Sequence, residues 1–475
     1  MLVTMFSFIA AEWEDTDRPL SYDFGYQTSS GSYVVSRSRL EVSHFNTDRL
    51  PSGTAKAEYV LPIRLQVYDV LNAKESAYSD IKVEEGAKMT VDGVQAYFSS
   101  GLEASNGFSD GITEIVAAVS SMVNQANCLD TPDCERIGRK NCSTVSGTCG
   151  ECLNGYIGET GSSNDRCFYV GYDLRRAQAV NFEECDSNNI CTVASKGCPM
   201  DCSGHGECRF VSPQRSNITF DECTLIDFHC VAKCFCNEGF AGSLCDLSDT
   251  DFLGLQQTRN EIVQAIGNVS KLDDATAETL HSWLQGLSEV CNNADGLLEE
   301  TKHLISKIAV ELLDSAKTLE LPYETISSIS KTLELVLSAL VSGDGAAPVD
   351  LLNSYAAFIA SDMVQGQNAV TITSTSYRLA TFAFDGLGNT TFQTPQSAIE
   401  ANFEQIPQSV ILPASSTNSG FKVSLIELLV PTVNSHSFLS NPLGLRFDDV
   451  PCDIRNGRCS MSVTLQHNIP NGYGE

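Results

Sequence analysis

Residues 234–245 of this chain read Cys234-Phe-Cys236-Asn-Glu-Gly-Phe-Ala-Gly-Ser-Leu-Cys245, which is three cysteines and a glycine-rich turn within twelve residues. Outward from this stretch, sixteen of the 19 cysteines lie within residues 128–245. The three others are Cys291, Cys452 and Cys459. So dense a block predicts a disulfide framework that forms in an oxidising compartment.

Zinc is the alternative to disulfides, because paired C-x2-C motifs with histidines are common metal ligands. Only one such pair occurs, Cys149-Gly-Glu-Cys152, and the block contains only His205 and His229. A redox role for the same pair would require the end of a strand in a βαβ unit, and neither flank fits that pattern. We therefore predict neither a metal nor any other cofactor.

The charge balance excludes several classes of partner. Of the 475 residues, 60 are acidic and 30 are basic, so the formal net charge is −30. Nucleic acid and anionic lipid both need a positive face, and neither is expected as the main partner. No stretch approaches the roughly 18 to 20 consecutive apolar residues of a bilayer span. Membrane contact is expected only through segments absent from this sequence.

Four Asn-x-Ser/Thr sequons are expected glycosylation sites of a secreted or cell-surface chain, at Asn141, Asn217, Asn268 and Asn389. The N-terminus is unlike a signal peptide, since it has no basic start and polar residues break its apolar stretch. Because the cysteine block requires an oxidising compartment, we expect Met1 to lie inside a domain of a longer extracellular protein.

Residues 1–88 are predicted to form a β-sandwich, because apolar and polar residues alternate there. The clearest strand is Tyr59-Val-Leu-Pro-Ile-Arg-Leu-Gln-Val-Tyr68, and residues 69–73 after it have the composition of a hairpin turn. The residues expected to face inward are Val60, Leu65 and Val67.

The segment Trp13-Glu-Asp-Thr-Asp-Arg-Pro-Leu-Ser-Tyr-Asp-Phe-Gly-Tyr26, followed by Leu50-Pro-Ser-Gly53, resembles the receptor-for-egg-jelly (REJ) module of polycystin-type proteins. In that family a strand precedes the tryptophan segment, and residues 4–11 would be that strand here. The resemblance implies a sandwich that is incomplete at its N-terminus. An unrelated fibronectin-like sandwich is the alternative.

Helices are predicted in two parts of the chain. Residues 89–127 have apolar residues at helical spacing, which predicts a short helical segment of two amphipathic helices that pack against a neighbour. Residues 247–345 predict a bundle of four helices of roughly 15 to 22 residues, one of them over 297–319. A coiled coil is the alternative, but its heptads would be interrupted by glycines and Pro322. The N-cap signals are Asp273, Asp274 and Asp295.

The run Cys198-Pro-Met-Asp-Cys202-Ser-Gly-His-Gly-Glu-Cys208 and the final C-x-C-x8-C resemble an epidermal-growth-factor-like (EGF-like) domain over residues 198–246. The resemblance implies the pairs Cys198–Cys208, Cys202–Cys234 and Cys236–Cys245. It leaves Cys223 and Cys230 in an insertion, where they could close their own loop. Calcium-binding members have acidic residues ahead of the first cysteine, whereas this chain has Ala194-Ser-Lys-Gly197, so no calcium is expected.

Residues 128–197 are predicted to form a diverged cysteine-rich module of similar size. A Cys152–Cys167 bridge across the Gly-Tyr-x-Gly turn is the pairing we expect, and Cys185–Cys191 would close a local loop. Six cysteines permit 15 connectivities, so the remaining pairs stay open. The cysteines concerned are Cys128, Cys134, Cys142 and Cys149.

A strand-like sequence pattern returns in residues 346–475, after a glycine-rich linker and a helix near Leu351–Met363. The expected strands are 369–374, 377–384, 409–413, 421–430 and 461–465. Helices followed by such strands, with Gln365-Gly-Gln-Asn-Ala-Val-Thr-Ile-Thr-Ser-Thr-Ser-Tyr377 and Val410-Ile-Leu-Pro413, resemble the GPCR-autoproteolysis-inducing (GAIN) domain. The resemblance implies a helical subdomain over 247–345 and a β-sandwich over 346–475 that is incomplete at its C-terminus. Cys452 and Cys459 would staple a loop between strands.

No catalytic residue is predicted. The GAIN family cleaves itself at a His-Leu-Ser/Thr site, but the only His-Leu here, at His303, lies on a predicted helix and lacks the adjacent hydroxyl. Phosphate-loop, Gly-x-Ser-x-Gly and His-Glu-x-x-His motifs are absent. Carboxylate pairs such as Asp15 with Asp17 are expected to be solvated. Cys291 is expected to be a buried thiol or the partner of a cysteine outside this sequence.

The predicted fold class is therefore multidomain: a β-sandwich, disulfide-rich modules, an α-helical bundle and a second β-sandwich. The predicted function is recognition or adhesion by an extracellular fragment of a polycystin-like receptor or channel-associated membrane protein. The expected partners are an unidentified extracellular protein or glycan and the missing parts of its own chain. The alternatives are a secreted matrix adhesion protein with no membrane portion and a secreted hydrolase.

Overall fold

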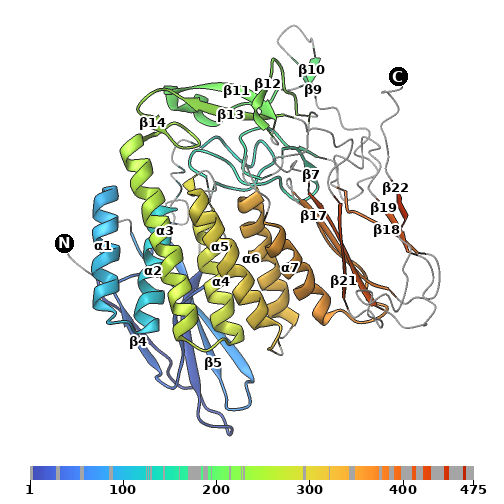
Figure 1. The fold of residues 1–475 in the computed structure, drawn as a ribbon. Coiled ribbons are helices and arrows are strands. Elements are labelled where there is room, and N and C mark those ends of the chain that lie inside the picture. Colours follow the sequence, from blue (N-terminus) through green and yellow to red (C-terminus); the bar gives the residue numbers. More distant parts are fainter. Residues whose placement is uncertain are drawn as a thin grey trace.

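Helices form the centre of the protein in the computed structural model (Figure 1). A β-sandwich (blue) lies against one side of them, further strands (orange and red) lie beyond α7, and cysteine-rich modules (green) cross one end. The structure describes residues 4–27, 33–53, 58–84, 89–124, 126, 128, 131–142, 145–159, 161–169, 183–185, 191–193, 195–212, 215–225, 227, 230–292, 296–319, 321, 323–341, 348–373, 377–384, 390–396, 409–412, 421–428, 443–448 and 464–466.

The N-terminal sandwich has one sheet of four antiparallel strands in the order β3-β2-β5-β6 and a second sheet of two, β1-β4. The strands are β1 (Phe6–Ile9), β2 (Ser21–Gln27), β3 (Tyr33–Leu40), β4 (His44–Thr47), β5 (Val60–Tyr68) and β6 (Lys74–Lys82). Aromatic rings fill the space between the two sheets, since the centroids of Phe8, Phe24 and Phe45 lie 5.8–6.2 Å apart.

The prediction that Val60 faces inward with Leu65 and Val67 was wrong. Alternate residues of a strand share a face, and in β5 the inward set begins at Leu61 and continues through Ile63, both buried. Val60 is therefore on the opposite face. A shift of one residue is enough to exchange the two faces.

The other face of the four-stranded sheet is polar. The Tyr68 hydroxyl lies 2.6 Å from Oδ2 of Asp23 and 3.1 Å from Oε1 of Gln66, and all three side chains are buried. At the rim of the sandwich, Thr47 donates a hydrogen bond to Glu114 of α2. Burial raises the pKa of Glu114, and the Thr47 hydrogen bond opposes this shift. The Thr47–Glu114 hydrogen bond thus connects the sandwich to α2.

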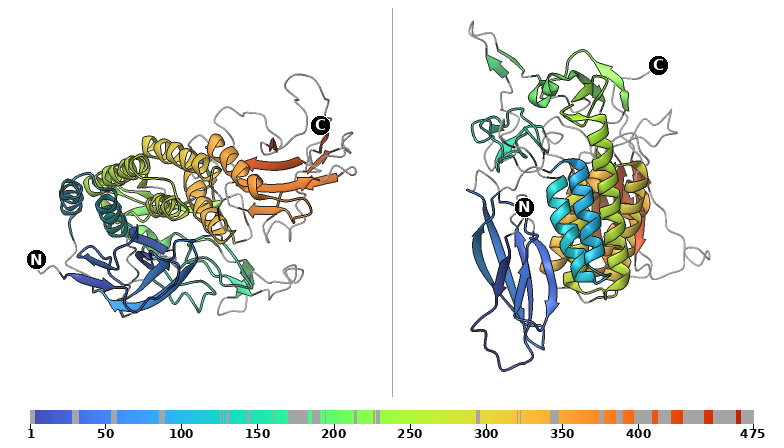
Figure 2. Two further views of the ribbon diagram at one scale, coloured as in Figure 1. Left: turned by 90° about the horizontal axis from the view of Figure 1, so that it is seen from below. Right: turned by 90° about the vertical axis from the view of Figure 1, so that its left-hand side faces the viewer.

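Seven helices share one apolar core. They are α1 (Val91–Ala104), α2 (Ser109–Val123), α3 (Asp249–Leu272), α4 (Ala277–Cys291), α5 (Glu299–Ala316), α6 (Tyr323–Val341) and α7 (Val349–Asp362). The 24 residues of α3 make it about 36 Å long. Figure 2 shows α1 and α2 beside α3, although about 125 residues separate α2 from α3 in the chain. Helices α1 and α2 are therefore part of the bundle core.

The helix starts differ from those predicted. Thr276 is the N-cap of α4, and its side chain and that of Thr279 form a reciprocal capping box. Asp273 is instead the C-cap of α3. Leu298 is the N-cap of α5, and Asp295 lies outside the described residues. Threonine competes well with aspartate at an N-cap, so the sequence signal was ambiguous by a few residues.

Arg259 of α3 fixes α2 to the bundle. Its guanidinium donates to the carbonyl of Val123 at 3.0 Å and lies within 3.4 Å of Oδ1 of Asn124. Asn124 donates in turn to the carbonyl of Glu289 at 2.6 Å. Burial lowers the pKa of Arg259 to about 10. The C-terminal end of α2, where backbone carbonyls lack partners within the helix, is a favourable place for this charge.

Beyond α7, one sheet has the order β16-β17-β20-β21 and another β18-β19-β22. The strands are β16 (Val370–Thr373), β17 (Tyr377–Phe384), β18 (Thr390–Gln393), β19 (Ser409–Leu412), β20 (Phe421–Leu428), β21 (Leu443–Asp448) and β22 (Thr464–Gln466). Tyr377, Leu379 and Ile426 extend the bundle core from this sheet. The strands β18 and β21 were not among those predicted.

We predict that adding one methyl group between α1 and α2 destabilises the whole bundle. A Cβ at Gly101 would overlap the side chain of Ile115, so Gly101→Ala should lower the free energy of unfolding by about 1–3 kcal/mol. Ser100→Ala, on the exposed face of the same helix, should change it by less than about 0.5 kcal/mol. Chemical denaturation of both variants checks this, and equal stability of the two would contradict a shared core.

Candidate functional site

Two cysteine modules meet at one end of the bundle. The first module, residues 128–169, contains the disulfides Cys128–Cys142, Cys134–Cys149 and Cys152–Cys167. Among its described residues, the strands are β7 (Tyr156–Ile157) and β8 (Phe168–Tyr169). The sequence left the first two pairs open and favoured the third. Since Cys149 and Cys152 each bond a different partner, neither sulfur is a thiolate ligand for zinc.

A buried arginine takes the place of an apolar core in the first module. The side chain of Arg139 is 1% exposed, and its guanidinium donates to four backbone carbonyls. The acceptors are the carbonyls of Gly150, Glu159, Gly161 and Asp165. Burial lowers the pKa of Arg139, and the carboxylates of Asp165 and Glu159 oppose the shift. One side chain thus holds three loops of the module in place.

The second module, residues 195–248, contains a three-stranded sheet in the order β12-β11-β13. Its elements are a short 3-10 turn (Pro199–Gly204), β11 (Gly206–Ser212), β12 (Arg215–Phe220), β13 (Val231–Cys236), β14 (Phe240–Ala241) and β15 (Leu247–Ser248). The structure joins Cys198 to Cys208, Cys202 to Cys234, Cys236 to Cys245 and Cys223 to Cys230. Gly239 and Gly242 have φ angles of 87° and 91°, which glycine adopts without strain in the last turn.

The second module continues directly into the bundle. Ser248, the last residue of β15, is also the N-cap of α3, and its side chain accepts a hydrogen bond from the amide of Asp251 at 3.1 Å. Strands β14 and β15 both contact α3. The orientation of this module is therefore fixed to the longest helix.

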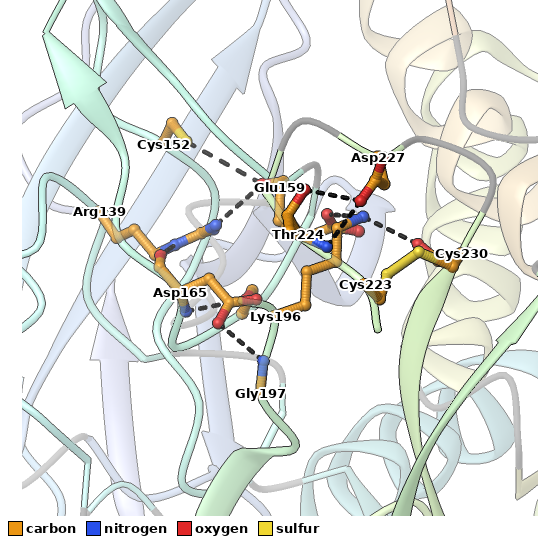
Figure 3. Close-up of polar contacts among 11 residues, drawn as sticks. Arg139, Cys152, Glu159, Asp165, Lys196, Gly197, Cys223, Thr224, Asp227 and Cys230 are labelled. Atoms are coloured by element: carbon orange, nitrogen blue, oxygen red, sulfur yellow. Dashed lines mark hydrogen bonds and ion pairs between the residues drawn. A yellow bond between two sulfur atoms is a disulfide. The ribbon is translucent and has the colours of Figure 1, made fainter. Parts of the chain in front are cut away.

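Lys196 joins the two modules (Figure 3). Its side chain is 4% exposed, its Nζ lies 2.6 Å from Oε2 of Glu159 in the first module, and it donates to the carbonyl of Cys230 in the second at 2.9 Å. The backbone amide of Gly197 donates to Oδ1 of Asp165 at 3.0 Å. We call these five residues the joint.

Neighbouring hydrogen bonds hold the joint in place. The amide of Lys196 donates to the carbonyl of Cys223 at 2.8 Å. The carboxylate of Asp227 accepts from both the amide and the hydroxyl of Thr224, at 2.8 and 2.6 Å, which closes the turn that follows Cys223 (Figure 3). The segment before Cys198 is thus tied along its length to the disulfide-closed insertion.

Apolar contact adds to the joint. Met200 of the second module lies directly over Gly147 of the first, where any side chain would overlap its thioether. Residues 200–203 all have φ between 48° and 55°, a left-handed run that is unusual outside glycine. The Cys202–Cys234 disulfide holds this run in place.

Asp165 is a titratable member of the joint. Burial raises its pKa, while hydrogen bonds from Ser163 and from the Gly197 amide oppose the shift. The first module also changes the electrostatics of the bundle. Burial raises the pKa of Glu334 on α6, and the charge of Glu151 in the first module raises it further. No part of the sequence pattern pointed to Arg139, Glu159 or Asp165.

Some predicted site residues lie elsewhere. Cys185 and Cys191 are paired in register between β9 (Glu183–Cys185) and β10 (Cys191–Val193), and their side chains are outside the described part of the chain. Cys452 and Cys459 lie outside it entirely. Cys291 is a buried free thiol at the end of α4, and burial raises its pKa to about 12.

Two of the four sequons can be placed. Asn141 in the first module and Asn268 on α3 are both exposed. Asn217 lies in β12, but its side chain is not described, and Asn389 lies outside the described residues.

Carboxylates come together once in the N-terminal sandwich. Oxygens of Asp15, Asp17 and Asp69 lie within 4.8 Å of one another, with Asp15 and Asp17 exposed. Oδ1 of Asp15 accepts from the Asp17 amide at 2.9 Å, so this group forms part of a local turn. The sulfurs of Cys198, Cys202 and Cys234, also close together, are all in disulfides.

Comparison with protein families shows what the N-terminal part of the chain resembles. Residues 1–115 match the family model of the REJ domain, which covers the N-terminal sandwich, α1 and the first half of α2. A search of curated proteins found no match. The REJ domain is extracellular and characteristic of polycystin-like proteins, and the seven described disulfides fit an extracellular protein. Among the helices of the described residues, none combines the length and the apolar character that crossing a bilayer requires.

We predict that Lys196→Met loosens the joint. The substitution keeps an apolar stem but leaves the Cys230 carbonyl and the Glu159 carboxylate without their partner, at a cost of about 1–3 kcal/mol. Hydrogen exchange measured by mass spectrometry should show faster exchange at the amides of Lys196 and Gly197. Lys140→Met is the matched control, because its pair with Glu151 is exposed and should contribute less than about 1 kcal/mol. Unchanged exchange in Lys196→Met would contradict the joint.

The raised pKa of Asp165 predicts how the joint depends on pH. Since the folded-state pKa lies above the ordinary value of 3.8, the stabilising contribution of this group is present below 3.8 and is lost as the pH rises through the raised value. Asp165→Asn should remove that loss and still accept from the Gly197 amide. Subtracting its stability-versus-pH curve from that of the unmodified protein isolates the effect. A pH-independent difference would show that burial of Asp165 has no such cost.

Proposed function

We propose that this chain is an extracellular recognition or adhesion region of a polycystin-like membrane protein. The match of residues 1–115 to the REJ domain carries the proposal. The disulfides support an extracellular setting, and the net charge of −30 makes nucleic acid and anionic membranes unfavourable partners.

We assign the second cysteine module as EGF-like. Its first-to-third, second-to-fourth and fifth-to-sixth pairing, counted without the Cys223–Cys230 insertion, is the pairing that the resemblance implies. The helices α3–α7 with the sheet beyond them would then be a GAIN-like region, a proposal supported by the packing of β17 and β20 against α7.

The joint supports recognition because it fixes geometry. Two small modules, each with little core, are oriented to each other by Lys196 and to the bundle by α3. Because the modules are already fixed to each other, separate surfaces of both can bind one partner at the same time. Little further conformational entropy is then lost on binding. We propose no catalysis in this chain, since the charged groups of the joint bond one another and backbone groups.

Adhesion of coated beads tests the proposal. Beads carrying the disulfide-intact chain from a secretory host should bind cells or extracellular matrix severalfold more than beads carrying the reduced and alkylated chain. The protein should lose apparent mass on deglycosylation, since Asn141 and Asn268 are exposed. Binding equal to that of albumin-coated beads on every cell type and matrix tried would contradict the proposed function.

A further inference from the structure

The N-terminal sandwich carries an open groove of about 660 Å³, apart from the joint. It is formed where β3 ends, where β2 begins and where the turn between β5 and β6 comes up beside them. Its apolar lining includes Pro19, Leu40, Val42 and Val70.

Apolar side chains at this groove are exposed to solvent. Leu40 is 37% exposed, Val42 38% and Val70 53%, and the neighbouring Leu71 is 72% exposed. Single exposed apolar residues are common, but a group of four around one groove is the usual mark of an interaction surface.

The turn that presents Val70 and Leu71 is preformed. Oδ1 of Asp69 accepts from the amides of Leu71 and Ala73, both at 2.8 Å, and the Asp69 amide donates to the Ala73 carbonyl at 3.1 Å. Hairpin turns usually carry polar or small residues at their tips. Here a rigid turn exposes two branched apolar side chains to water. A partner that covers them therefore loses little free energy to the ordering of this loop.

Among the described residues that line the groove there is one arginine, Arg39, and it is already engaged. The Arg39 guanidinium donates to Oγ of Ser21 at 2.6 Å, to Oδ1 of Asn72 at 2.8 Å and to the carbonyl of Asp69 at 3.1 Å. It also lies 4.4 Å from the centre of the Tyr68 ring. These acceptors within the protein occupy its donors, so it offers little to an anionic partner.

Exposed carboxylates lie at and beside the groove, whereas the neighbouring basic residues Arg18 and Lys74 are not part of its lining. Glu41 lines the groove and is exposed. The exposed pair Asp15 and Asp17 lies beside Asp69, the residue that precedes Val70, and the Val70 amide donates to the carbonyl of Asp17 at 3.4 Å. An apolar floor with an acidic rim is complementary to apolar side chains flanked by positive charge.

We propose that this groove docks a segment of another protein in which leucine-like side chains alternate with lysine or arginine. A second copy of this chain fits less well, because two acidic rims would meet and each chain carries a net charge of −30. This inference rests on the proposed recognition function, for which it names a binding site.

Peptide binding to the purified chain tests the groove. The probe is a fluorescein-labelled nonapeptide in which leucine or valine alternates with lysine, followed by fluorescence anisotropy. The double variant Val70→Ser/Leu71→Ser should weaken binding about tenfold, which is 1.4 kcal/mol. The matched control, Leu272→Ser/Val364→Ser, removes two equally exposed apolar side chains far from the groove in sequence and should bind like the unmodified chain.

Charge is tested separately. Asp17→Asn/Glu41→Gln should weaken binding severalfold and flatten its salt dependence, and a peptide with glutamate for lysine should not bind. Equal affinity for the groove and control variants, or binding by a lysine–serine peptide as tight as by the lysine–leucine peptide, would overturn the proposal. So would sedimentation showing that the unmodified chain self-associates through Val70 and Leu71. Failure here leaves bead adhesion intact, so the two proposals fail separately.

Discussion

The ammonium group of Lys196, buried between two modules that have almost no apolar core, is the interaction on which the arrangement at the end of the bundle depends. Disulfides hold each module together but none of the described ones crosses from one module to the other. Domains this small cannot bury enough apolar surface to fix a mutual orientation. A buried ion pair with a carbonyl acceptor has strict geometry, and breaking it leaves an unpaired charge, so it suits this role.

The protein uses two kinds of packing for two purposes. Apolar side chains from seven helices and one sheet build a continuous core, which supplies most of the stability of the bundle. Buried polar groups instead set orientation: Arg139 inside the first module, Lys196 between modules, and Tyr68 with Asp23 inside the N-terminal sandwich. Desolvation moves the pKa of Arg139 down and that of Asp165 up, so both charges are held at a cost. Such groups add specificity more than stability.

Local pattern was enough for much of the fold. Helical spacing located the helix Glu299–Ala316, and alternation located the strands Tyr377–Phe384 and Val60–Tyr68, because both signals depend on neighbours in sequence. Register is a finer property, and Val60 was placed on the wrong face by one position. β18 escaped prediction because it is only four residues long and three of them are polar.

The candidate site could be predicted only in its cysteines. Fixed spacings and a family resemblance implied the pairs of the second module, whereas Cys128–Cys142 and Cys134–Cys149 had no such guide. Lys196 was noticed only as a residue unsuited to calcium. One of its acceptors is a backbone carbonyl, as are the four acceptors of Arg139. Every residue has a backbone carbonyl, so the residue types in the sequence do not reveal such acceptors. We infer that the joint and α3 hold the two modules and the bundle together as one rigid body. The most direct test is the distance distribution between spin labels on non-natural residues at Glu135 and Asn268, measured by pulsed dipolar spectroscopy. A rigid arrangement gives one narrow distribution in the unmodified protein, and this distribution should broaden in Lys196→Met. A broad distribution in the unmodified protein would show that the modules move relative to the bundle.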